Sequence, residues 1–193
     1  MLTDERTHDC AMMTAEEFLA LPDDGTDRVL IDGKVLSWGP RIAARTRFQC
    51  TVEARIAKLL GIWLDGNPSF GGVVASGKAG FRLRRTPDSL VGADVAYVNA
   101  EVVSASPPST PFFDGPPVLA VEILSPSDRH EEVVAKVRKY LEVGSVVWVV
   151  DPDFQMVTVH RPGELPDGLN SAHELSAEGY LPGFRVSVRA LFE

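Results

Sequence analysis

Apolar residues recur at helical spacing in two long segments of the chain. The one nearer the C-terminus covers residues 130–143, and Gly144, which follows it, is a favourable residue for ending a helix. We expect Ser127 or Asp128 to cap that helix. In the first segment, residues 45–64, apolar side chains three and four positions apart predict an amphipathic helix. Its expected buried face consists of Phe48, Val52, Ile56, Leu59, Leu60 and Trp63.

Polar residues mark a short helix and a hairpin nearer the N-terminus. Thr14 and Glu17 have the spacing of a capping box, which predicts a helix over residues 15–21. Asp32-Gly33 separates two apolar stretches within residues 28–38. This dipeptide is typical of a two-residue turn, so we expect a β-hairpin there.

The remaining apolar runs predict strands. We expect them at residues 73–83, 93–98, 118–124, 145–151 and 155–160. Residues 99–117 are rich in Pro, Ser and acidic side chains and predict an irregular loop. Strands mixed with helices, without an internal repeat or linker, predict one α/β (α+β) domain over residues 1–193, with residues 1–12 as a loose arm.

Composition narrows the class of protein. The chain has 193 residues, of which 45% are hydrophobic and 24% charged, as in a globular protein. Its formal net charge of −8 argues against a general nucleic-acid coat but allows a local basic groove. The chain has neither an apolar run of about 20 residues nor a secretory start, so we expect a cytoplasmic protein without a membrane partner.

Glu122 carries the strongest chemical signal, because it interrupts the apolar run 118–124. A buried carboxylate costs several kcal/mol unless it has a partner, a proton or a metal. A glutamate facing solvent and a core ion pair are the alternatives. Asp94 lies in another apolar run, and two carboxylates on neighbouring strands, about 4–6 Å apart, could share one Mg²⁺. Lys136 lies at the margin of a helical apolar stripe, where it could reach inward or remain at the surface.

Several motifs together resemble the Uma family of putative restriction endonucleases, part of the PD-(D/E)XK nuclease superfamily. The most specific are Glu122-Ile-Leu-Ser-Pro-Ser-Asp, Lys136-Val-Arg-Lys-Tyr140, Gly144 and Trp148-Val-Val-Asp-Pro152. Supporting motifs are Met13-Thr-Ala-Glu-Glu-Phe-Leu, Leu30-Ile-Asp-Gly33, the run with Asp94, and Leu181-Pro-Gly-Phe. The resemblance covers nearly the whole chain, in order.

The resemblance implies a restriction-endonuclease-like mixed β-sheet flanked by helices, and metal-dependent hydrolysis of DNA. Asp94 and Glu122, helped by the Ile123 carbonyl, would bind Mg²⁺ or Mn²⁺. Lys136 would replace the catalytic lysine that many relatives carry two residues after the glutamate, where this chain has Leu124. DNA is the expected partner, and Arg45, Arg47 and Arg84, which lie in locally basic runs of the sequence, are candidates for phosphate contacts. A homodimer is an open alternative to the monomer.

Two departures from the family pattern leave other functions open. Val29 stands where the family usually has Glu, so it marks a lost site position, and Arg45 stands where His is frequent. The chain could therefore be a catalytically impaired nuclease fold that binds DNA or a protein partner. A structural oligomerisation protein, whose acidic residues are merely paired, is the third hypothesis.

Overall fold

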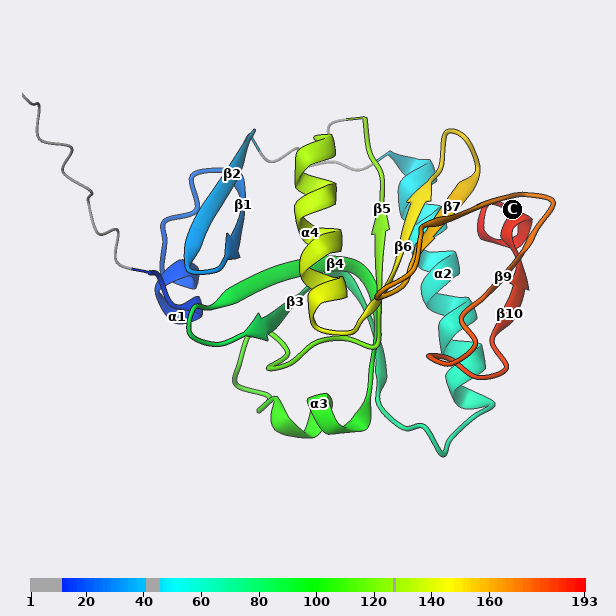
Figure 1. Cartoon of the computed structure of the whole chain (residues 1–193), viewed down its shortest axis with the longest axis horizontal. Coiled ribbons are helices and arrows are strands. Elements are labelled where there is room, and N and C mark those ends of the chain that lie inside the picture. Colours follow the sequence, from blue (N-terminus) through cyan, green and yellow to red (C-terminus); the bar gives the residue numbers. More distant parts are fainter. Residues whose placement is uncertain (1–11, 41–45, 127) are drawn as a thin grey trace, which may run out of the picture.

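A computed structural model of the chain describes residues 12–40, 46–126 and 128–193. Within these residues, eight strands form one sheet in the order β2-β1-β4-β5-β6-β7-β8, with β3 paired to β4 (Figure 1). The strands are β1 (Thr26–Ile31), β2 (Lys34–Pro40), β3 (Val73–Arg84), β4 (Ser89–Val98), β5 (Leu119–Ile123), β6 (Val146–Asp151), β7 (Met156–His160) and β8 (Asp167–Asn170). A separate pair consists of β9 (Glu174–Ser176) and β10 (Arg185–Ser187).

The helices cover both faces of the sheet. They are α1 (Ala15–Leu19), α2 (Arg47–Asp65), α3 (Ala100–Ala105), α4 (His130–Glu142) and the 3₁₀ helix η1 (Val188–Leu191). One face packs against α2 and the C-terminal segment, and the other packs against α4 (Figure 1). This arrangement confirms the predicted mixed sheet flanked by helices.

The sheet is mixed because α4 crosses over between two parallel strands. β5 and β6 pair in parallel, and the other pairs in the sheet are antiparallel. A parallel pair needs a crossover connection, which α4 provides. The helix therefore lies over the strand that carries Glu122.

Local signals located several elements correctly. Thr14 and Glu17 form the predicted capping box at α1. The predicted hairpin joins β1 to β2, and Asp32 and Gly33 adopt the positive φ angles of 48° and 73° that a primed turn requires. The long helix begins at Arg47, after the N-cap residue Thr46. Arg45 lies outside the described residues.

Three local expectations were wrong. The segment expected to be irregular contains α3, because the Asn99 side chain caps it by accepting a hydrogen bond from the Val102 N–H at 2.9 Å. Asp128 does not cap α4: Arg129 is the N-cap, and the Asp128 carboxylate accepts a hydrogen bond from the Ser125 N–H. Ser127 lies outside the described residues. Phe48, expected in the core, is 37% exposed at the start of α2.

Candidate active site

Asp94 and Glu122 lie on paired strands and face α4. Ala96 in β4 pairs with Ala120 in β5, and both pack with Tyr140 of α4. Side chains alternate along a strand, so the residues two positions further on lie on the same face. Those residues are Asp94 and Glu122, which come opposite each other when the antiparallel register is continued one pair beyond Val95 and Val121.

Both carboxylates are buried, and the charge of Asp94 acts on Glu122. Asp94 is 4% exposed and Glu122 is 6% exposed. The Ile123 backbone N–H donates a hydrogen bond of 2.8 Å to Asp94 Oδ2, which ties this carboxylate to the strand of Glu122. Backbone geometry thus fixes the orientation of Asp94 relative to β5.

Lys136 reaches the same point from α4. Its Nζ donates a hydrogen bond to Glu122 Oε2, and both side chains are largely buried. The other oxygen, Glu122 Oε1, is buried and has no hydrogen-bond partner within the described part of the chain. Buried polar atoms in native proteins are normally satisfied, so an unpartnered carboxylate oxygen indicates room for a ligand or a proton.

Electrostatics separate the protonation behaviour of these groups. Burial raises the pKa of Glu122 to about 7, against the attraction of Lys136 and with the repulsion of Asp94. Burial alone would lower the pKa of Lys136, but the Glu122 and Asp94 carboxylates outweigh it and raise that pKa. Near neutral pH the site therefore holds a charged lysine and a glutamate that can gain or lose its proton.

The N-terminus of α2 meets the end of β5 through Gln49, a residue that the sequence interpretation missed. Gln49 is 4% exposed, and its Nε2 donates a 3.0 Å hydrogen bond to the Leu124 carbonyl. Its Oε1 accepts a hydrogen bond from the Thr46 N–H at 2.9 Å, completing a capping box. The Thr46-x-x-Gln49 spacing was the available signal. Arg47, the first residue of α2, is thereby held near the end of β5.

A cavity of about 500 Å³ opens beside Lys136, between α1, β1 and α4. Its lining includes Lys136 and Glu132 from α4, and Asp27 and Val29 from β1. Lys78 also lines it and forms a 3.5 Å ion pair with Asp27. Glu132 was not predicted, although its position four residues before Lys136 places both on one helix face.

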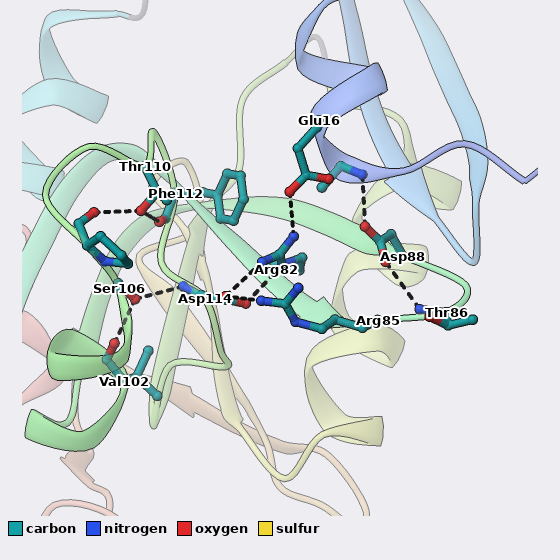
Figure 2. Close-up of polar contacts among 12 residues, drawn as sticks. Glu16, Arg82, Arg85, Thr86, Asp88, Val102, Ser106, Thr110, Phe112 and Asp114 are labelled. Atoms are coloured by element: carbon teal, nitrogen blue, oxygen red, sulfur yellow. Dashed lines mark hydrogen bonds and ion pairs between the residues drawn. The ribbon is translucent and has the colours of Figure 1, made fainter.

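A buried arginine holds together the segments next to this cavity. Arg82 donates hydrogen bonds of 2.9 and 2.7 Å to Asp114 and one of 2.7 Å to Glu16 in α1 (Figure 2). Its guanidinium lies 4.9 Å from the centre of the Phe112 ring, which lines the cavity. Arg85 also pairs with Asp114. The network joins α1, β3 and the segment after α3.

Two other predicted positions have surroundings of their own: Val29, taken from the family pattern, and Arg84, taken from a locally basic run of the sequence. Val29 is 7% exposed and packs in the apolar cluster that includes Phe81 and Val91. Arg84 ends β3 and acts electrostatically on Asp32, at the hairpin turn that Lys139 of α4 contacts, one helical turn beyond Lys136. The structure thus brings together Asp94, Glu122 and Lys136 and places Arg84 apart from them.

The donor set of the site fits a hard divalent cation. It offers two carboxylates, one of which has an unpartnered oxygen, and hard ions such as Mg²⁺ prefer oxygen ligands. Residues 12–40, 46–126 and 128–193 contain no group of three or more His, Cys, Asp and Glu that could hold a metal ion. Mg²⁺ commonly binds through one or two carboxylates and keeps several waters, so two carboxylates are sufficient.

Comparison with known proteins places the chain in a family. Residues 15–189 match the Uma2 family, described as "Putative restriction endonuclease", and the chain belongs to this family. Its fold is similar to the crystal structure of a "putative nuclease belonging to DUF820" from Anabaena variabilis ATCC 29413. The TM-score is 0.75 at 18% sequence identity, over 93% of this chain and 97% of that chain. No curated protein matches the chain.

Family and fold together support a nuclease. Restriction-endonuclease-like proteins generally use divalent metals, which agrees with the oxygen donors found at β4 and β5. No helix in the described residues is long and apolar enough to cross a membrane.

Proposed function

We propose that the chain is a divalent-metal-dependent endonuclease that hydrolyses phosphodiester bonds in DNA. The observation that carries the proposal is the meeting of three buried charged groups at one point. Asp94 and Glu122 face each other across paired strands, and Lys136 reaches them from the crossover helix. Mg²⁺ or Mn²⁺ is the expected ion, because carboxylate oxygens suit both.

Each residue has a distinct role in this proposal. Asp94 and Glu122 would hold the ion, with the Ile123 carbonyl as a further oxygen donor. The bound ion would polarise the phosphate and lower the pKa of a water molecule. Lys136 would position water and stabilise the negative charge that develops on the phosphate. Arg47, near the end of β5, would contact a neighbouring phosphate of the DNA.

A catalytically impaired nuclease fold is the second candidate, and the environment of Val29 favours it. The position that usually holds an acidic residue in the family is here a buried valine in an apolar cluster. If catalysis needs that carboxylate, the chain would bind DNA or a protein partner without cutting DNA.

A cleavage assay on supercoiled plasmid distinguishes the two candidates. We expect nicked and linear products with Mg²⁺ or Mn²⁺, no products with a chelator, and no products from Asp94→Asn. DNA binding in a gel-shift assay without cleavage would instead support the impaired form. Absence of cleavage, DNA binding and metal binding would refute the nuclease and the DNA-binding form, and would leave a protein-binding or structural role.

A further inference from the structure

In the absence of metal, the ammonium of Lys136 is the cation of the site. Its Nζ contacts Glu122 Oε2, and the charge of Asp94 also acts on it. A divalent ion that binds Glu122 brings a second positive charge to the same carboxylate. Even when the ion enters at the unpartnered Glu122 Oε1, two cations on one carboxylate repel each other, so metal binding should weaken the contact between Glu122 and the ammonium.

A second acidic partner for the ammonium lies on its own helix. Glu132 precedes Lys136 by four residues in α4, a spacing at which Glu and Lys side chains meet on one face. Its negative charge already acts on Lys136. Glu132 is partly buried, so its attraction is less screened by solvent than that of a fully exposed side chain.

Glu132 lies on the side of Lys136 that faces the cavity. Lys136 and Glu132 both line it, whereas Asp94 and Glu122 do not. Lys136 therefore faces the inner carboxylates on one side and the cavity on the other. Two other acidic residues act on Glu132 and have partners of their own: Asp27 of β1 forms an ion pair with Lys78, and Asp128 accepts a hydrogen bond from the Ser125 N–H. Glu132 is thus the acidic residue on the same face of α4 as Lys136.

We propose that Glu132 is a positioning residue, which receives the Lys136 ammonium when a divalent cation takes Glu122. This inference rests on the proposed function. The ammonium would then lie at the cavity wall, next to the carboxylates that would hold the ion. From there it could meet a phosphate oxygen.

The test measures Mn²⁺ affinity by isothermal titration calorimetry, without DNA and without a cleavage readout. Glu132→Gln removes the second partner, so the displaced ammonium costs more, and Mn²⁺ binding should weaken by about three- to tenfold. Glu131→Gln is the matched control, because Glu131 is adjacent, exposed and equally charged. It should leave the affinity unchanged, and Glu132→Asp should restore most of the loss.

A double-mutant cycle tests whether Glu132 acts through Lys136. In a Lys136→Met background, the effect of Glu132→Gln should disappear, because no ammonium remains to be received. An equal loss in that background would overturn the inference, since Glu132 would then act on the metal directly. Equal affinities of Glu132→Gln and the unmodified protein would also overturn it.

Two further results distinguish a failure of the proposed metal site from a failure of the proposed role of Glu132. If no form of the protein binds Mn²⁺, the metal site itself is refuted, and the displacement of Lys136 with it. If the unmodified protein binds Mn²⁺ but the cycle shows no coupling, only the role of Glu132 fails. Urea unfolding of each variant without metal checks that the fold is unchanged.

Discussion

Glu122→Gln is the substitution that best separates a metal ligand from a structural ion pair. It preserves the shape of a side chain that is only 6% exposed and removes its charge. Lys136 keeps the neighbouring charge of Asp94 after the change. We therefore expect the variant to fold, to lose Mn²⁺ binding and to lose metal-dependent DNA cleavage.

The pKa of Glu122 gives the expected size of the stability change. Burial raises it from 4.5 to about 7. At about 1.4 kcal/mol per pKa unit, this shift means that folding favours the protonated form of Glu122 over the ionised form by about 3 kcal/mol. Because the folded pKa lies above the unfolded one, this stabilisation is fully present below the unfolded pKa of 4.5 and is lost as the pH rises through about 7.

A glutamine at position 122 stays neutral throughout this pH range. Without metal, the variant should be as stable as the unmodified protein at about pH 4.5 and more stable by about 2–3 kcal/mol at about pH 8. Urea unfolding at the two pH values measures the difference. Added Mn²⁺ should stabilise the unmodified protein in proportion to its binding and leave the variant unchanged.

The opposite result would refute this reasoning. If the Lys136–Glu122 pair only holds the core together, Glu122→Gln should destabilise the protein by about 3–5 kcal/mol near about pH 8, because the substitution breaks a buried ion pair. A variant that cleaves DNA at the unmodified rate would remove Glu122 from the mechanism.

Three further predictions follow from the same geometry. Asp94→Asn should abolish Mn²⁺ binding and lower the pKa of Glu122, because a like charge is lost; an NMR titration in which that pKa stays near 7 would show that the carboxylates do not interact. Val29→Glu should strengthen Mn²⁺ binding in calorimetry and lower stability, because it buries a carboxylate in an apolar cluster; no gain in affinity would mark the position as structural. Arg47→Gln should weaken DNA binding and reduce the slope of log affinity against log salt by about one, with a smaller effect expected from Arg84→Gln; equal effects would contradict a site at the end of β5.

Local signals predicted those elements whose causes lie within a few residues. The capping box at Thr14 and the Asp32-Gly33 turn depend on hydrogen bonds and backbone angles between near neighbours. The apolar period of α2 predicted its buried face, apart from Phe48. The error at α3 has the same origin: a Pro- and Ser-rich composition outweighed the single cap at Asn99.

The candidate site was predicted in part, because its chemistry is local but its geometry is not. A glutamate inside an apolar strand is unusual in any context, so Glu122 stood out. Whether it faced solvent, a core partner or a second carboxylate depended on the pairing of β4 with β5, which are separated by α3 and its following segment. Gln49 and Glu132 carried weak local signals. Their contacts with the site became evident only from the packing of α2 and α4 against the sheet.

The sequence alone determined the class of fold, the family motifs and the identity of the chemically unusual residues, because these depend on periodicity, capping and the cost of a charge in an apolar strand. The tertiary structure decided which charges meet. Strand register set Asp94 opposite Glu122, and the crossover between β5 and β6 directed Lys136 of α4 to the same point. The pKa of Glu122 follows from this assembly, since burial and the neighbouring charges of Asp94 and Lys136 exist only once the sheet and helix have packed.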